Sequence, residues 1–299
     1  MPAALTHYSF ALEVIKELKD IDIDAFTLGT QGPDPFFYRG ILKKGRPSNY
    51  KDIWQIGENL HHSDVSSIYI KMLENAKGDK QLSSFVYGLF LHYCLDKRVH
   101  PYVFYRSGFD SNGGLEGKFK YNHGAFEALL DVRLSKLLKT YKNPGKTINV
   151  AKLDLDKISS LFNVVEDKNM TPTTYKESVI DFIGIEKLLF SRSGLKRILF
   201  RLTGKYSLAM AMSYPHFYKK ADYFDVLNLK KSNWKDPSTL VMSNDSILDL
   251  FDKAKKEFIE FYPHLVNIDN DAIKSYCKEL NHDGTPFKDK KREYSICFR

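Results

Sequence analysis

Cysteine is scarce in this chain, and the three that occur lie far apart. Cys94, Cys277 and Cys297 have neither pairing nor metal-site spacing, which excludes a disulfide framework and a cysteine-ligated metal. No run of 18 apolar residues occurs, so no membrane-spanning helix is expected. Residues 1–7 lack the basic and apolar regions of a secretory signal. We therefore expect a soluble, cytoplasmic protein.

Strand-like alternation is also scarce, and apolar residues recur instead at helical spacing. We predict an all-α protein with helices over residues 8–19, 50–62, 64–76, 81–96, 122–140, 151–163, 172–202, 206–228 and 244–262. Six of the nine histidines precede residue 124, and few follow the turn at 143–145. This change predicts a catalytic helical region over 1–145. Residues 146–299 would pack on it, either as a second domain or as part of the same one.

Acidic residues are outnumbered: 45 Lys and Arg against 37 Asp and Glu give a formal net charge of +8. A positive field favours phosphates, nucleic acid or an acidic lipid surface, although an ordinary solvated lysine-rich surface explains it equally well. The segment Leu195–Tyr206 is both basic and apolar. We predict a packed helix with its lysines in water there, with transient contact to a membrane surface as the alternative.

The strongest motif for chemistry lies in an apolar helical stretch. His92 and Asp96 are four residues apart, so both stand on one helix face, and His100 continues the stripe where we expect Pro101 to end the helix. Imidazole and carboxylate groups directed into apolar surroundings need hydrogen bonds or a metal ion. The spacing therefore predicts metal ligands.

A second pair, His123 and Glu127, repeats the four-residue spacing on the next predicted helix. One such pair is weak evidence, because histidine and glutamate four residues apart also meet on ordinary surfaces. Two pairs on neighbouring helices favour a shared site. Imidazole with carboxylate is the ligand set of hydrolytic zinc, and its bonds of roughly 2.0–2.2 Å require the side chains to converge.

The remaining candidates are dispersed along the first half of the chain. His7 lies near the start of the first predicted helix, and Asp34 stands between two prolines that fix its backbone. His61 and His62 are adjacent, so on a helix they point about 100° apart and only one is expected to join a given metal. Each is singly more typical of a structural residue, but their clustering favours a common site.

The order of these motifs resembles the zinc-dependent phospholipase C family, which shares its fold with single-strand-specific zinc nucleases. The resemblance covers roughly residues 1–140. It rests on His7, Gly32-Pro33-Asp34-Pro35, Leu60-His61-His62, His92 with Asp96, His100-Pro101, and His123 with Glu127. It implies an all-helical, multi-helix fold of the phospholipase C and zinc nuclease type, with zinc ions in a cleft.

Carried over by motif, the resemblance implies three sets of zinc ligands. The first set is Asp34, His61, His92 and Asp96; the second is His100, His123 and Glu127; the third is His7 with the far oxygen of Asp96. The motif favours His61 over His62. Secreted members complete the third set with an N-terminal Trp, whereas this chain begins Met1-Pro2. We therefore expect two or three zinc ions.

The implied activity is hydrolysis of a phosphodiester by metal-activated water, with Asp34 as the catalytic carboxylate, either as ligand or as general base. The expected substrate is a phospholipid or another phosphodiester. Aromatic segments at 36–38 and 102–105 would line a lipid pocket or simply pack as core. The alternatives are a nuclease or nucleotidase, which would bind nucleic acid, and a metal-binding protein without activity.

Overall fold

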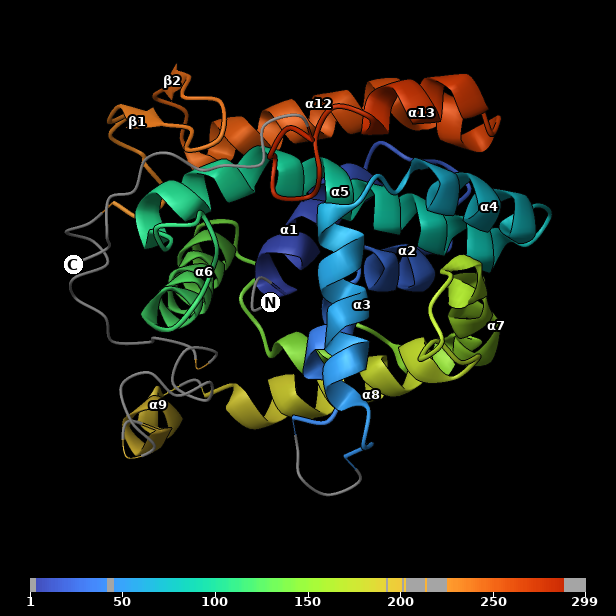
Figure 1. Cartoon of the computed structure of the whole chain (residues 1–299), viewed down its shortest axis with the longest axis horizontal. Helices are drawn as coiled ribbons and strands as arrows, with labels where there is room; N and C mark the ends of the chain where they lie inside the picture. Colours follow the sequence, from blue (N-terminus) through green and yellow to red (C-terminus); the bar gives the residue numbers. More distant parts are fainter. Residues whose placement is uncertain are drawn as a thin grey trace.

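The computed structural model describes residues 4–41, 46–191, 193–200, 202, 213 and 225–287. Helices dominate these residues, and the described strands form one two-stranded antiparallel hairpin, which confirms the all-α prediction (Figure 1). The α-helices are α1 Ala4–Ile15, α2 Ile23–Gly29, α3 Tyr50–His62, α4 Ser66–Ala76, α5 Lys80–Ser107, α6 Lys118–Leu137, α7 Leu155–Ser160, α8 Thr174–Leu189, α9 Leu195–Phe200, α12 Ile247–Val266 and α13 Asn270–Cys277. The shorter elements are 3-10 helices η1 Asp34–Tyr38, η2 Pro144–Lys146, η3 Val150–Lys152 and η4 Leu161–Val164, with strands β1 Trp234–Lys235 and β2 Met242–Ser243.

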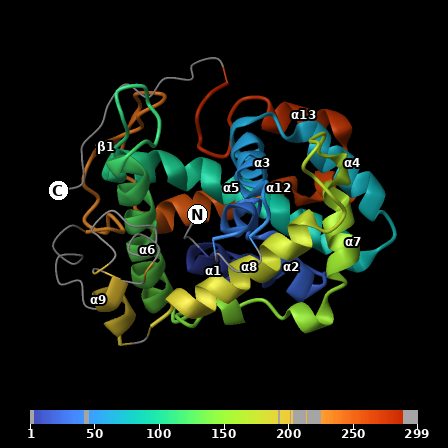
Figure 2. The same ribbon diagram turned by 60° about the horizontal axis from the view of Figure 1, so that its bottom comes forward.

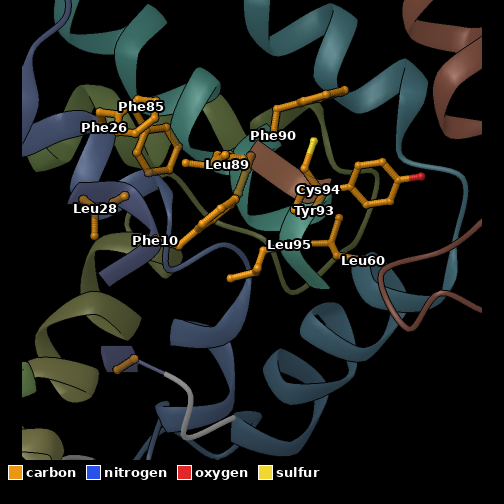
Figure 3. Close-up of a cluster of buried hydrophobic side chains, with 14 of the residues drawn as sticks. Phe10, Phe26, Leu28, Leu60, Phe85, Leu89, Phe90, Tyr93, Cys94 and Leu95 are labelled. Carbon is orange, nitrogen blue, oxygen red and sulfur yellow. The ribbon is translucent and has the colours of Figure 1, made fainter. Parts of the chain in front are cut away.

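Helix α5 is the central element of the fold. Its 28 residues give it a length of about 42 Å at 1.5 Å per residue. The Asp79 side chain caps its first turn by accepting hydrogen bonds from the backbone of Gln81 and Leu82. Helices α2, α4, α6 and α12 all pack against α5. Aromatic and aliphatic side chains from α1, α2, α3 and α5 form the core beside it (Figure 3).

Two glycines let α2 and α5 meet backbone to backbone. A Cβ atom on Gly29 would lie 2.1 Å from the Phe85 carbonyl oxygen, and one on Gly88 would lie 2.2 Å from the Phe26 carbonyl oxygen. Any larger residue at either position would force the two helices apart. This close packing places the chain after α2, which carries Asp34, directly beside the middle of α5.

A buried carboxylate ties α1 to α6. Asp131 accepts hydrogen bonds from the backbone nitrogens of Leu5 and Thr6, at 3.1 and 2.8 Å, and from the Thr6 hydroxyl at 2.6 Å. These bonds satisfy donors at the start of α1 that have no partner within the helix. They also fix His7, one residue further on, relative to α6.

Several predicted boundaries were wrong in an informative way. Helix α5 does not end at Pro101 but continues to Ser107. Pro101 cannot donate to the Lys97 carbonyl oxygen, and Gly284 packs against that oxygen and the proline ring instead. The helix predicted over 172–202 is interrupted between Leu189 and Leu195, where Gly194 adopts a positive φ of 71°.

Other differences are smaller. The helices predicted over 8–19 and 122–140 start and end earlier, as α1 and α6, and the one predicted over 64–76 starts two residues later, as α4. The segment predicted as a helix over 151–163 consists of short helices. The prediction missed α2, α13 and the β1–β2 hairpin. The helix predicted over 206–228 lies mostly outside the described residues. Cys297 also lies outside them. No described helix has the length and apolar character needed to cross a bilayer.

The two predicted regions share one hydrophobic cluster. Phe251, Ala254 and Phe258 of α12 belong to the same buried cluster as Phe10 of α1 and Phe85 of α5. In Figures 1 and 2, α12 and α13 lie along α5 on the side opposite α8. Residues after 145 therefore cover the helix that carries the central histidine motif.

Candidate metal centre

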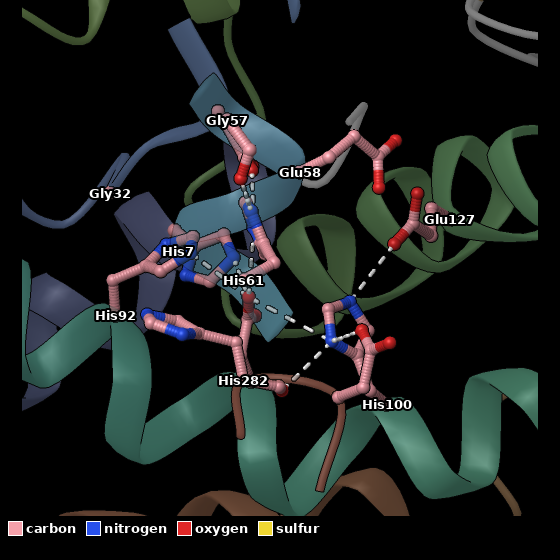
Figure 4. Close-up of polar contacts among 12 residues, drawn as sticks. His7, Gly32, Gly57, Glu58, His61, His92, His100, Glu127 and His282 are labelled. Carbon is pink, nitrogen blue, oxygen red and sulfur yellow. Dashed lines mark hydrogen bonds and ion pairs between the residues drawn. The ribbon is translucent and has the colours of Figure 1, made fainter. Parts of the chain in front are cut away.

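The structure brings all eight predicted ligand residues together, and Figure 4 labels five of them: His7, His61, His92, His100 and Glu127. They come from α1, η1, α3, α5 and α6. Their ligand atoms form three groups in which every atom lies within 4.8 Å of the others: His7, His92 and Asp96; Asp34, His61 and His92; His100, His123 and Glu127. The first two share His92, and we call their five residues the inner group. The third is the outer group.

Asp96 is the hub of the inner group. Its Oδ1 atom lies 3.1 Å from His7 Nε2, and its Oδ2 atom lies 2.9 Å from His92 Nε2. His61 Nε2 is 3.9 Å and His100 Nδ1 3.8 Å from the same Oδ2. One carboxylate therefore faces four imidazoles, as expected of a group that bridges neighbouring cations.

Asp34 reaches the site because of the glycine that precedes it. Gly32 has a positive φ of 59°, and a Cβ atom there would lie 2.3 Å from the His92 ring. Only glycine combines this backbone conformation with such close contact. The chain then turns through Pro33, and Asp34 Oδ1 comes to lie 3.2 Å from His61 Nε2.

Three of the histidines are oriented by backbone carbonyl groups. The Nδ1 atoms of His61, His92 and His100 lie 2.8, 3.1 and 3.1 Å from the carbonyl oxygens of Gly57, Thr30 and His282. In a neutral imidazole, an Nδ1–H that donates to a carbonyl leaves Nε2 unprotonated, which is the tautomer that binds a metal through Nε2. In the outer group, His100 Nε2 and His123 Nε2 then face Glu127 Oε1 at 3.5 and 3.2 Å.

The distances within the groups fit shared cations. Donor atoms around a tetrahedral zinc with bonds of roughly 2.0–2.2 Å lie about 3.3 Å apart. His92 Nε2 approaches Asp96 Oδ2 without the alignment of a hydrogen bond. Glu127 Oε2 is buried and has no hydrogen-bond partner among the described residues. Buried polar atoms left in this way normally have a ligand, so these groups could hold metal ions.

Electrostatics keep the carboxylates of the site ionised. Burial alone would raise the pKa of Asp96, but the facing imidazoles of His100, His92 and His7 hold it well below its usual value. Burial is likewise outweighed at Glu127, where His123 and His100 lower the pKa to about 2. Both side chains are therefore negatively charged and ready to bind a cation near neutral pH.

His282 and Asp283, near the C-terminus, also contribute to the site, and neither was among the predicted site residues. The His282 backbone N–H donates to the His61 carbonyl oxygen at 3.1 Å, while the His282 carbonyl accepts from His100. Asp283 Oδ2 lies 3.1 Å from His62 Nε2, and Asp283 Oδ1 lies 3.5 Å from His100 Nδ1. The only sequence signal was a His-Asp-Gly turn, which is common in loops.

The structure also separates the two adjacent histidines. His61 is buried and faces Asp34, whereas the side chain of His62 is 50% exposed and faces Asp283. The hydrogen bond to Asp283 raises the pKa of His62 despite its partial burial. His62 is therefore part of the rim, and His61 is the one that joins a ligand group.

Both groups open into a pocket of about 200 Å³. All the ligand residues except the fully buried His92 line it, and its walls include Phe37, Glu58, Phe104, Lys120 and Asp283. Of the two aromatic segments, Phe36, Tyr38 and Tyr102 are core residues, while Phe37 and Phe104 face the pocket. The pocket thus combines apolar walls with an acidic, imidazole-rich floor.

Comparison with known proteins gave no relatives: no family model, curated protein or solved structure matches this chain. The assignment of the site therefore depends on its own geometry.

Proposed function

We propose that this protein is a zinc-dependent phosphodiester hydrolase similar to the zinc-dependent phospholipase C family, with the multi-helix fold of that family. One observation carries the proposal. Buried imidazole and carboxylate groups from five separate elements converge in three groups on the floor of one pocket. Ordinary structural histidines are satisfied by single hydrogen bonds and do not assemble in this way.

The donor set suits zinc. Nitrogen and oxygen ligands with no thiolate favour a borderline cation that performs hydrolysis. The inner group would hold up to two ions, with Asp96 between them, and the outer group one. When bound, zinc lowers the pKa of a coordinated water to about 7 and neutralises charge on phosphoryl oxygens.

The chain's own residues supply the remaining requirements. Asp34 is ionised, because burial, which would raise its pKa, is outweighed by nearby positive charge, including that of His61 and His92, and the pKa is lowered. It lies on the pocket floor, where its carboxylate can accept the proton of an attacking water. Phe37 and Phe104 limit the water in the pocket, and the Lys120 ammonium attracts an anionic phosphodiester.

The decisive experiment compares three substrates on zinc-loaded protein: a short-chain phosphatidylcholine, a single-stranded oligonucleotide and bis(p-nitrophenyl) phosphate. We expect turnover of the generic phosphodiester and of the lipid. Turnover of the oligonucleotide but not the lipid would move the protein to the nuclease alternative. Zinc binding without turnover of any of the three substrates would favour the alternative of a metal-binding protein without activity.

The matched variants are His92→Ala and His264→Ala. His92 belongs to both of the ligand groups that make up the inner group, whereas His264 is exposed and pairs with Asp269 on the surface. His92→Ala should lose zinc and turnover together, and His264→Ala should keep both. Wild-type turnover by His92→Ala, with its zinc lost, would refute the proposal.

A further inference from the structure

Helix α9 presents an exposed row of aliphatic side chains. Leu195, Ile198 and Leu199 are 61%, 59% and 62% exposed, and Leu202, just beyond the helix, is 86% exposed. Their spacing of three and four residues places them on one face. The packed helix predicted for this segment is therefore wrong for its described residues, because the apolar face points to solvent. We call these four residues the α9 surface.

The α9 surface lies within the most unbalanced stretch of charge in the sequence. Residues 187–221 contain eight Lys and Arg and no Asp or Glu. That excess equals the formal net charge of the whole chain, +8, so the rest of the chain is formally neutral. Residues 187–221 are therefore one of the strongly basic stretches of the sequence, together with 35–51 and 132–153, and the one that carries the α9 surface.

Cations of this segment are held beside the aliphatic row. The Lys196 ammonium donates to the Leu188 carbonyl oxygen at 2.6 Å, and Leu188 is itself 50% exposed. The Arg197 guanidinium donates to the backbone and side-chain oxygens of Ser213. Charge and apolar surface thus occur side by side. In Figures 1 and 2, α9 lies at the edge of the molecule, far from α4 and α13.

We propose that the α9 surface docks on an anionic lipid membrane. Aliphatic side chains bordered by lysine and arginine enter the boundary between headgroups and acyl chains, while the cations attract acidic lipids. Six residues are too few to span a bilayer, so the contact is interfacial. Single-stranded nucleic acid is the weaker match, because bases stack on aromatic side chains and the exposed row is aliphatic.

The test is co-sedimentation of the full chain with phosphatidylcholine vesicles that contain or lack phosphatidylserine. We expect binding to the anionic vesicles, weaker binding to the neutral ones, and a decrease as salt is raised. The triple variant Leu195→Ser/Ile198→Ser/Leu199→Ser should reduce partitioning by about tenfold or more. Its circular dichroism and Tm should match the wild type, because the side chains are exposed.

A matched control removes equally exposed apolar side chains elsewhere. Val241→Ser/Met242→Ser acts on residues that are 61% and 60% exposed near the β hairpin, and it should leave vesicle binding unchanged. Equal losses in both variants, no wild-type binding, or binding only to an oligonucleotide would overturn the proposal. So would concentration-dependent self-association that the triple variant abolishes, because the α9 surface would then contact a second copy.

The proposal stands apart from the hydrolase assignment. His92→Ala should lose zinc but still bind anionic vesicles, because His92 lies in the core of the metal centre and not on α9. The triple variant should keep its zinc. Failure of the vesicle experiment would therefore leave the metal centre untouched, and loss of zinc chemistry would leave the membrane contact untouched.

Discussion

The inner and outer groups of the metal centre differ in what holds them. In the inner group, His61 and His92 are oriented by Gly57 and Thr30, which lie in the same N-terminal third of the chain. In the outer group, His100 is oriented by the carbonyl of His282, 182 residues away. The two inner imidazoles are thus oriented by nearby carbonyl groups and that of His100 by a distant loop, whose His282 N–H also donates to the His61 carbonyl oxygen.

The largest effect should come from Asp96→Ala, because Asp96 faces both groups. We expect the loss of all bound zinc, since Asp96 is the carboxylate that pairs with His7 and His92 and also faces His61 and His100. Glu127→Ala should remove only the ion of the outer group. Elemental analysis of the purified proteins measures the difference. An Asp96→Ala protein that keeps zinc in the inner group would contradict the role of Asp96 as hub.

Gly284→Ala should affect metal binding at the outer group and not at the inner group. A Cβ atom there would lie 2.4 Å from the Lys97 carbonyl oxygen and 2.7 Å from the Pro101 ring, so the loop over residues 281–285 must shift away from α5. We expect loss of the outer ion with the inner ions retained, measured as zinc per chain.

The control for that variant is Gly78→Ala. Gly78 also has a positive φ, of 84°, but an added Cβ would meet nothing within 4 Å. Both variants share the backbone cost of about 1–2 kcal/mol for a left-handed residue, and only Gly284→Ala displaces the loop. Equal zinc contents in the two variants would show that the outer group does not depend on this loop.

Asp283→Asn should have a smaller effect on the same group. The asparagine keeps the size of the side chain but removes the negative charge 3.5 Å from His100 Nδ1. Loss of a partner behind a metal ligand typically lowers metal affinity 10–100-fold. We expect about tenfold at the outer group, because the His282 carbonyl still orients His100, and no change at the inner group. Competition with a chromogenic chelator measures both affinities.

The difference between contacts within the first half of the chain and contacts from the distant loop also explains what could be predicted from the sequence. Spacing of four residues on helices was enough to find His92, Asp96, His123 and Glu127, because helix geometry turns that spacing into proximity. The Gly-Pro-Asp motif pointed to Asp34, and the structure shows why glycine precedes it. The backbone contacts of His282 with His61 and His100 could not be predicted, because every residue type except proline provides both a backbone N–H and a carbonyl group.

The extent of α5 was missed for a related reason. Proline disfavours the helix interior when only the local sequence is considered. In the fold, the Lys97 carbonyl oxygen that Pro101 leaves without its helical donor is covered by Gly284. The segment that packs against α5 at Pro101 comes more than 180 residues later, so its contact with the helix could not be read from the local sequence.

The smallest expected effect concerns a second link from the C-terminal region to α5. Glu257 of α12 forms ion pairs with Lys97 at 2.6 Å and Arg98 at 2.8 Å, between Asp96 and His100 in sequence. Burial opposes ionisation, but these two cations lower the pKa of Glu257 below its usual 4.5. Its stabilising contribution is therefore present above about pH 4.5 and lost as the pH falls through the lowered pKa.

Glu257→Gln should consequently destabilise the protein near pH 7, by about 1–2 kcal/mol, since the ion pairs are replaced by weaker neutral hydrogen bonds. The difference from wild type should shrink as the pH falls through the lowered pKa of Glu257 and the wild-type side chain becomes protonated. Urea unfolding at several pH values measures it. Because Glu257 is not a ligand, zinc content should be unchanged. A selective loss of the outer ion would instead show that the outer group depends on α12 as well as on the 281–285 loop.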